Sequence, residues 1–163
     1  MITATRRIQF CAGHRVMGHE SKCAHLHGHN YVALITVKAE LPGGVDGIGR
    51  VIDFSAIKNI AGKWIDENWD HGFILHKEDN AGLDALIAFD NAMVMPRNGI
   101  PFRQKTYLMP YNPTAENMAK YLLEVILPRI FPSEIKATKV RIWETENCYA
   151  DAVDTEESAT HEG

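Results

Sequence analysis

Three histidines alternate over five residues in the segment CAHLHGH, which spans residues 23–29 and begins with a cysteine. In an extended chain, residues two apart point to the same face, so His27 and His29 can present two imidazoles to one point. Two convergent neutral imidazoles form the core of a zinc site, and a catalytic zinc has three protein ligands and a fourth position open to water or substrate. Cys23 lies close enough in the sequence to reach a group bound at that open position. The segment therefore predicts a metal site beside a thiol.

A solvated polar loop is the alternative explanation for any cluster of histidines. Five of the eight histidines fall between His14 and His29, however, and scatter does not readily produce that density. Spacing alone leaves open which other histidine of this stretch supplies a third ligand.

Two further acidic positions could take part in chemistry. Asp70 precedes His71 directly, and a carboxylate beside an imidazole can fix its tautomer and stabilise its protonated form. An adjacent Asp-His pair is more often part of a polar loop, and the residues alone favour that interpretation. Glu144 follows Val140 and Ile142 on one face of an alternating segment, so it is predicted to be either an edge residue or a binding group.

The composition is that of a soluble globular chain, because 45% of the 163 residues are hydrophobic and 23% are charged. The formal net charge of -4 argues against a nucleic-acid partner, which favours basic surfaces. No apolar run approaches the roughly 20 residues of a membrane span, and the N-terminus lacks the apolar core of a signal peptide. The three cysteines form no visible disulfide framework. We therefore expect a reducing, cytoplasmic setting without a membrane partner.

Apolar alternation predicts the elements that must position these residues. Residues 2–10 predict a strand that runs on to His14, and residues 27–39 predict a second strand that is apolar, and therefore buried, on both faces. The two strands could pair as a hairpin with the metal loop at one end. A helix follows, with Asp53 or Ser55 as its N-cap and an apolar stripe at helical spacing.

The second half of the chain predicts fewer regular elements at first and then a clear helix and two strands. Residues 76–111 are difficult to interpret and predict, in order, a short helix near 83–87, a loop at 96–101 and an extended segment at 105–109. A helix then starts at Thr114 and ends between Pro128 and Pro132.

Two strands, at 136–144 and 147–153, close the predicted domain, and the polar tail at 154–163 is expected to be disordered. The order strand-strand-helix-helix-strand-strand predicts an α+β fold, in which two helices pack on one face of an antiparallel β-sheet. We expect a single domain over residues 1–153.

Several motifs, in this order along the chain, resemble the 6-pyruvoyltetrahydropterin synthase / 6-carboxytetrahydropterin synthase family. They are FCAGH at 10–14, CxxxHGH at 23–29, VIDF at 51–54, DH at 70–71, PTAEN at 113–117 and WET at 143–145. Separately spaced motifs are together more specific than any one alone. The resemblance implies the tunnelling fold, whose subunits assemble around a central barrel, commonly as a hexamer of two stacked trimers with active sites between subunits.

The resemblance also implies a role for each candidate residue. It makes His14, His27 and His29 the ligands of Zn²⁺, and it leaves the other two histidines of that stretch outside the metal site. It identifies three catalytic residues and three residues that bind the pterin. The catalytic residues are Cys23, Asp70 and His71, and the binding residues are Glu144 as pterin anchor with Thr114 and Thr145 lining the pocket. This implication overrides the polar-loop interpretation of the Asp-His pair.

The family's substrate class is 7,8-dihydroneopterin triphosphate, and two reactions share the same machinery. The pyruvoyl branch eliminates triphosphate and rearranges the side chain, toward tetrahydrobiopterin. The carboxy branch also breaks a carbon–carbon bond, releases acetaldehyde and leaves 6-carboxy-5,6,7,8-tetrahydropterin, toward queuosine. We favour the carboxy branch because the C-terminal half is more similar to bacterial members.

The chain departs from the family pattern over residues 77–112. This stretch is longer than the usual link between the Asp-His pair and the Pro-Thr helix start, so we expect an insertion that could reshape the substrate mouth. A non-catalytic pterin- or purine-binding module of the same fold is one alternative function. A zinc hydrolase is another, and it would not need Glu144.

Overall fold

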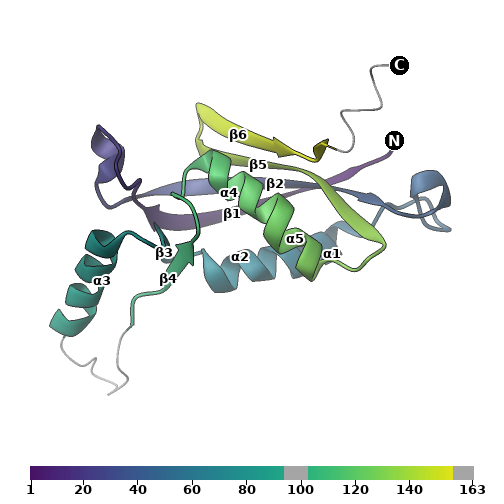
Figure 1. Ribbon diagram of the computed structural model, residues 1–163. Helices are drawn as coiled ribbons and strands as arrows, with labels where there is room; N and C mark the ends of the chain where they lie inside the picture. The colour runs from purple at the N-terminus through teal and green to yellow at the C-terminus, as the bar shows by residue number, and fades with distance from the viewer. Residues whose placement is uncertain (94–102, 156–163) are drawn as a thin grey trace.

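The computed structural model describes residues 1–93 and 103–155. The predicted loop at 96–101 and most of the predicted tail lie outside this part of the chain. Within it, six strands form one sheet in the order β4-β3-β1-β2-β5-β6 (Figure 1). The strands are β1 (Ala4–His14), β2 (His27–Ala39), β3 (Gly72–His76), β4 (Thr106–Met109), β5 (Ile135–Thr145) and β6 (Cys148–Val153).

Two long helical segments lie on the same side of this sheet (Figure 1). The first consists of α1 (Phe54–Ile57), a π-helical segment (Lys58–Gly62) and α2 (Lys63–Asn68). The second consists of α4 (Ala115–Tyr121), a π-helical segment (Leu122–Ile126) and α5 (Leu127–Ile130). A third helix, α3 (Asn80–Ala92), projects away from the sheet (Figure 1). The predicted α+β fold, with two helices on one face, is confirmed.

Both long helices begin at the predicted N-caps. Asp53 accepts a hydrogen bond from the backbone N–H of Ser55 at 2.8 Å, and Thr114 accepts one from the N–H of Asn117 at 3.3 Å. These side chains satisfy backbone donors that have no partner inside the first turn of a helix. The second cap places Pro113, the residue before Thr114, against the end of β1, where its carbonyl contacts His14.

The hairpin of β1 and β2 carries the predicted metal loop at its closed end. The two strands pair antiparallel, with His14 opposite His27 and Ala12 opposite His29. The strand predicted at residues 2–10 extends without interruption to His14. A short 3-10 turn, Lys22–Ala24, lies in the connecting loop.

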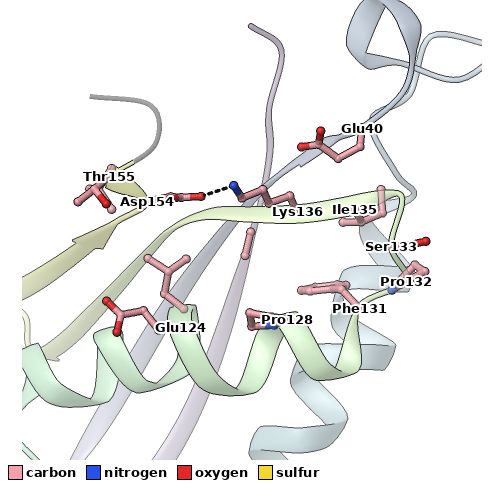
Figure 2. Close-up of a pocket in the computed structure, with 13 residues that line it drawn as sticks. Glu40, Glu124, Pro128, Phe131, Pro132, Ser133, Ile135, Lys136, Asp154 and Thr155 are labelled. Atoms are coloured by element: carbon pink, nitrogen blue, oxygen red, sulfur yellow. Dashed lines mark ion pairs between the residues drawn. The ribbon is translucent and has the colours of Figure 1, made fainter. Parts of the chain in front are cut away.

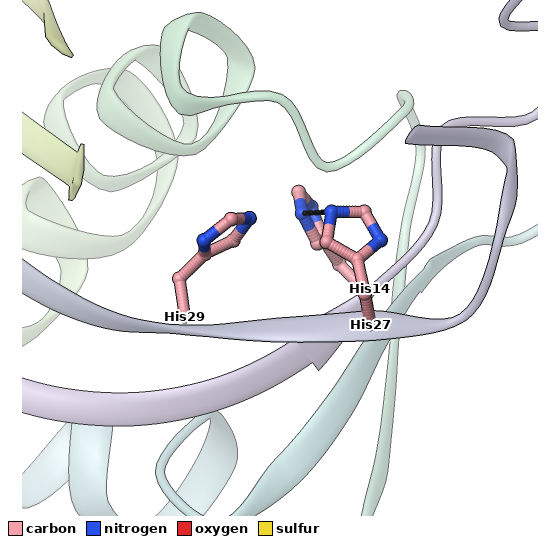
Figure 3. Close-up of side chains that lie close together, drawn as sticks. All are labelled: His14, His27 and His29. Carbon is pink, nitrogen blue, oxygen red and sulfur yellow. Dashed lines mark hydrogen bonds between the residues drawn. The ribbon is translucent and has the colours of Figure 1, made fainter. Parts of the chain in front are cut away.

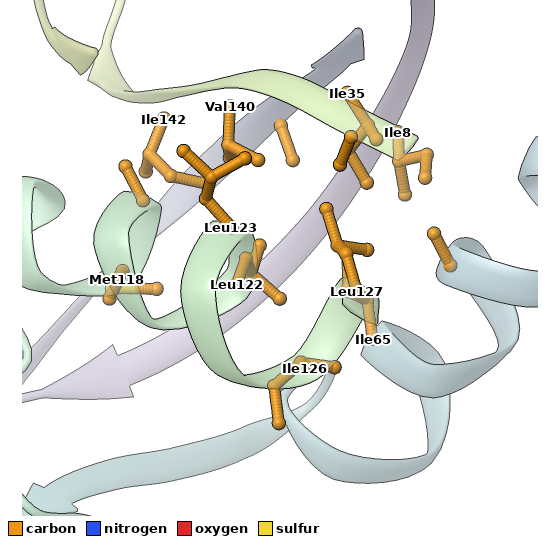
Figure 4. Packing of buried hydrophobic residues seen from close by; sticks show 14 of the residues in the cluster. Ile8, Ile35, Ile65, Met118, Leu122, Leu123, Ile126, Leu127, Val140 and Ile142 are labelled. Atoms are coloured by element: carbon orange, nitrogen blue, oxygen red, sulfur yellow. The ribbon is translucent and has the colours of Figure 1, made fainter. Parts of the chain in front are cut away.

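The sheet is covered on one face only. Side chains of β2 that point toward the helices, such as Tyr31 and Ile35, are fully buried, whereas Val32 and Leu34 on the other face are only half-buried. Figure 4 shows leucines of the second helical segment packed between the helices and the sheet. The prediction that β2 is buried on both faces is therefore wrong for the single chain, because both helices lie on the same side.

Strand β3 was not predicted, and the sheet is mixed rather than antiparallel throughout as predicted. β3 and β4 extend the sheet beyond β1, and both pair in parallel, β3 with β1 and β4 with β3. The segment predicted as extended at 105–109 is β4. β3 is a five-residue apolar run without alternation, and periodicity does not identify such a run as a strand. Helix α3 lies where a short helix was predicted, and it is longer than expected.

In the described part of the chain, no helix combines the length and the apolar character that crossing a membrane requires.

Replacing Leu122 by Ala should destabilise the fold by about 2–5 kcal/mol, because its side chain is 1% exposed and a cavity would remain between helix and sheet. Urea unfolding at a fixed protein concentration measures this loss. The control is Lys120→Ala on the exposed side of the same helix, which should change stability by no more than about 0.5 kcal/mol. Equal effects of the two variants would contradict the assignment of the core.

Candidate metal centre

The structure brings the three predicted metal ligands together. His14 ends β1, and His27 and His29 begin β2 on the same face, so strand pairing and alternation direct all three rings to one place (Figure 3). Their ligand atoms lie within 4.8 Å of one another. Nε2 of His14 is 3.1 Å from Nε2 of His27. These three residues are called the imidazole cluster below.

Backbone carbonyls determine the tautomers of two of these rings. Nδ1 of His14 donates to the carbonyl of Pro113 and Nδ1 of His27 donates to the carbonyl of His25, both at 2.7 Å. A carbonyl can only accept, so each Nδ1 carries the hydrogen and each neutral ring has an unprotonated Nε2. The two close Nε2 atoms then face each other with lone pairs, an arrangement that a shared cation would stabilise.

His29 completes the cluster with a nitrogen that lacks a partner. Its Nε2 is buried and forms no hydrogen bond within the described residues. The nearest carboxylate oxygen, Oε1 of Glu144, is 3.6 Å away, which is too far for a good hydrogen bond. A buried polar atom without a partner costs free energy, and a ligand bound at the cluster would remove that cost.

Burial keeps two of the rings neutral. It lowers the pKa of His14 from 6.5 to about 4, although the hydrogen bond to Pro113 opposes the shift. Burial also lowers the pKa of His29, against the opposing charge of Glu144. Neutral imidazole is the form that binds metal ions.

His14 of the cluster lines a cavity of about 300 Å³, together with three other predicted site residues. Its lining includes His14, Cys23, Thr114 and Glu144. Cys23 lies in the loop between β1 and β2, and its carbonyl accepts a hydrogen bond from the N–H of Val16 at 2.8 Å. A thiol, a carboxylate and one imidazole of the cluster therefore line one hollow.

Six further residues line this cavity and were not predicted as site residues. They are Val16, His19, Ala115, Glu116, Cys148 and Tyr149. The last two begin β6, and the tight connection from β5 to β6 brings them beside Glu144. The predicted strand pair at the C-terminus was the signal that could have placed them there.

Asp70 and His71 form the expected pair, but not in this cavity. Oδ2 of Asp70 accepts from Nδ1 of His71 at 2.7 Å, and Oδ1 accepts from the backbone N–H of Cys11 at 2.8 Å. The His71 side chain is 78% exposed. It borders a separate hollow with Gly13 and Phe73, on the open face of the sheet. A single chain therefore does not bring His71 and Cys23 into one cavity.

The Asp70 carboxyl is held in its ionised form. Burial raises its pKa, but the hydrogen bonds from Cys11 and His71, together with the charges of His71 and Lys105, lower the pKa by more. An ionised Asp70 can orient the His71 ring by accepting its Nδ1 hydrogen.

Thr145 also lies outside the cavity. Its exposed side chain is 2.9 Å from the sulfur of Cys148 and borders a hollow with Trp143 on the open face. Alternation explains this position, because Glu144 points toward the helices and its neighbour points the other way. The role of Thr145 in lining the pterin pocket stays a prediction, because Thr145 does not line the cavity in one chain.

Another hollow, of about 580 Å³, lies at the other end of β2, between α5 and the start of β5 (Figure 2). It holds an ion pair between Lys136 and Asp154 at 2.8 Å, and no histidine or cysteine occurs among the described residues that line it. Its chemistry does not match that of the imidazole cluster.

Known proteins resemble this chain in sequence over nearly its whole length. Residues 3–154 match the sequence profile of the family described as 6-pyruvoyl tetrahydropterin synthase. A protein of Rickettsia typhi named 6-carboxy-5,6,7,8-tetrahydropterin synthase is 43% identical over 152 residues, which cover 93% of this chain and 99% of that protein.

Solved structures show the same fold. An uncharacterized protein of Wolinella succinogenes superposes with a TM-score of 0.71 and 25% identity, covering 94% of this chain and 98% of that one. The 6-pyruvoyl tetrahydropterin synthase of Caenorhabditis elegans gives a TM-score of 0.58 at 24% identity, covering 94% and 95%. The fold is thus that of these pterin synthases, and with the match over nearly its whole length the chain belongs to the 6-pyruvoyl tetrahydropterin synthase family.

Proposed function

We propose that this protein is a zinc-dependent lyase that converts 7,8-dihydroneopterin triphosphate to 6-carboxy-5,6,7,8-tetrahydropterin, with release of acetaldehyde and triphosphate. The observation that carries the proposal is the imidazole cluster, one member of which, His14, lines the same cavity as Cys23 and Glu144. The relatives at 41–43% identity, all named 6-carboxy-5,6,7,8-tetrahydropterin synthase, support the carboxy branch over the pyruvoyl branch.

The imidazole cluster fits a zinc ion. Two ligand nitrogens at 2.0–2.1 Å from a tetrahedral zinc are roughly 3.3 Å apart, close to the 3.1 Å between His14 and His27. The carbonyls that accept from their Nδ1 atoms leave Nε2 free for the metal, as outer partners of zinc ligands commonly do. Zinc held here would supply Lewis acidity, which makes C–H and O–H groups beside a bound oxygen more acidic.

Cys23 is the proposed general base. It lines the same cavity as His14, so its thiolate could reach the substrate side chain and remove a proton from carbon or oxygen. The half-buried position limits access of water to the sulfur.

Glu144 is the proposed anchor of the pterin ring. Its carboxylate points into the cavity and can accept two parallel hydrogen bonds from a ring N–H and the adjacent amino group. Such paired contacts fix the orientation of a flat ring as well as adding affinity. Thr114 lines the same cavity from the start of α4.

The Asp70–His71 pair would act on the substrate from a second copy of the chain. His71 is exposed on the open face, whereas Cys23 opens on the helix side, so one chain holds only part of the catalytic set. The half-buried apolar residues of the open face, such as Leu34 and Trp143, support coverage by another copy. We propose a homohexamer of two trimers built around a central barrel.

The cellular setting is part of this proposal. The free thiols of Cys11, Cys23 and Cys148 suit a reducing compartment, and we place the reaction in the cytoplasm. The product would serve the synthesis of queuosine.

Incubating the zinc-loaded protein with 7,8-dihydroneopterin triphosphate should release acetaldehyde and triphosphate together. Acetaldehyde is measured with a coupled alcohol dehydrogenase and the pterin by its absorbance. Triphosphate without acetaldehyde would select the pyruvoyl branch. A bound pterin without any product would select the non-catalytic module and contradict the proposal.

Replacing Cys23 by Ala should reduce turnover by about 10²-fold to 10⁴-fold, the usual contribution of a general base, while the zinc content stays unchanged. The matched control is Cys11→Ala, whose thiol lies on the open face and donates to Asn30. Initial rates measure turnover and metal analysis measures zinc content, so the two together distinguish loss of the base from loss of the metal. Full turnover by the Cys23 variant would remove this residue from the mechanism.

The metal-free protein should lose stability as the pH falls from 7 to 4. His14 has a pKa of about 4 in the folded chain and 6.5 when unfolded, so the unfolded state binds more protons in this range and is favoured by acid. The full shift corresponds to about 3 kcal/mol.

Urea unfolding of the metal-free protein between pH 7 and 4 measures the slope of the unfolding free energy against pH. His14→Gln should flatten the slope, whereas His25→Gln, at an exposed position, should leave it unchanged. A wild-type stability that is constant or rises on acidification would refute the assignment of His14 as a buried neutral ring.

A further inference from the structure

Lys105 contacts the main chain of the Asp70–His71 segment from a distant part of the sequence. Its ammonium group donates to the carbonyl of Asp66 at 2.8 Å and to the carbonyl of Asp70 at 2.7 Å. Asp66 lies in the last turn of α2, whose carbonyls have no partners within the helix. The lysine therefore caps the end of α2 and holds the carbonyl of Asp70 at the same time.

Both the backbone and the aliphatic stem of Lys105 contact strand β3. Its backbone carbonyl accepts from the N–H of Phe73 at 2.8 Å, next to the pairing of β3 with β4. Its aliphatic stem lies against Gly72, where an added Cβ would be 2.9 Å from both Cγ and Cδ of Lys105. Only a glycine leaves space for the stem at this position.

The backbone that Lys105 contacts is strained. His71 has a φ of 55°, in the left-handed region that residues other than glycine rarely adopt. Its N–H donates to the carbonyl of Cys11 at 2.7 Å, and the N–H of Asp70 donates to the carbonyl of Ile65 at 2.9 Å. Such a conformation persists only where surrounding groups hold it, and Lys105 holds the carbonyl between these two bonds.

We propose that Lys105 is a positioning residue for catalysis, which acts by fixing the backbone of the Asp70–His71 pair and hence the direction of the His71 ring. This inference rests on the proposed function for the role of the pair, but the contacts themselves do not depend on it. Lys105 belongs to the stretch 77–112 that was expected to be an insertion, and it lies directly before β4.

The charge of Lys105 stabilises the ionised carboxylate of Asp70, in addition to its hydrogen bonds to the backbone. Burial alone would raise the pKa of Asp70, and the lysine is one of the groups that outweigh this effect. An ionised Asp70 accepts the Nδ1 hydrogen of His71, so the lysine supports both the backbone and the carboxylate of the pair. With two of its three N–H donors bound to carbonyls, the ammonium group is directed at the main chain rather than at substrate.

The test compares Lys105→Met, which removes the ammonium group at similar size, with Lys105→Arg and with Arg103→Met. Arg103 is an exposed cation two residues away and serves as the matched control. For Lys105→Met we expect kcat to fall about 10- to 100-fold, the cost of a small misplacement of a catalytic group, with KM changed less than about twofold. Lys105→Arg should recover part of the loss, and Arg103→Met should equal the wild type.

A double variant separates positioning from general loss of structure. If Lys105 acts through His71, adding Lys105→Met to His71→Ala should reduce kcat no further, because effects on residues that act as a unit are not additive. A second tenfold loss in that background would show a structural role and overturn the inference. Gly72→Ala, which displaces the stem of Lys105, should reproduce the loss in kcat.

Amide hydrogen exchange tests the same claim without activity. Exchange at His71 and Cys11 should accelerate in Lys105→Met and stay unchanged in Arg103→Met. Unchanged exchange and unchanged kcat in Lys105→Met would refute the inference. A wild type that does not turn over the pterin, but whose Lys105→Met variant shows the faster exchange, would refute the proposed function and leave the positioning of the pair supported.

Discussion

The pairing register of β1 with β2 is the constraint on which the metal centre depends. It sets His14 directly opposite His27, and the alternation of β2 then adds His29 on the same face. A slip of one residue would turn two of these rings to the open face. Fully buried side chains farther along β2, such as Tyr31 and Ile35, maintain this register. A slip of one residue would move these side chains to the open face and expose them to solvent. The hydrophobic core and the imidazole cluster are thus specified by the same periodicity.

Coverage of the sheet on one face divides the functional residues into two groups. The imidazole cluster, Cys23 and Glu144 face the helices, where burial lowers the pKa of His14 and His29 and leaves Nε2 of His29 without a partner among the described residues. The Asp70–His71 pair faces the other way, with His71 exposed and Asp70 half-buried. Under the proposed function, catalysis would therefore need a second copy, whose open face would meet the cavity of the first.

Residues that depend on local periodicity could be predicted from the sequence, and those that depend on distant pairing could not. The alternation of His27 and His29, the hairpin, and the helix caps Asp53 and Thr114 follow from short stretches of sequence, and the structure agrees with each. His14 was assigned by family resemblance, since spacing left the third ligand open. The convergence of the three rings agrees with that assignment, and His14 lines the same cavity as Cys23.

Three features could not be predicted from the sequence because they depend on distant pairing or on backbone conformation. They are strand β3, the face on which His71 lies and the contacts of Lys105. β3 is too short to show a period, His71 faces outward through a left-handed backbone, and Lys105 meets Asp70 only because β4 pairs in parallel with β3. Thr145 illustrates a related limit, since a family motif identifies a residue but not the face on which a single chain presents it.

X-ray absorption at the zinc edge of the metal-loaded protein tests the central claim most directly. Three imidazole nitrogens from the cluster predict a first shell of nitrogen and oxygen at about 2.0–2.1 Å, with imidazole outer-shell scattering and no sulfur. A sulfur scatterer at about 2.3 Å would make Cys23 a ligand rather than a base. A shell without imidazole scattering would contradict the metal centre itself.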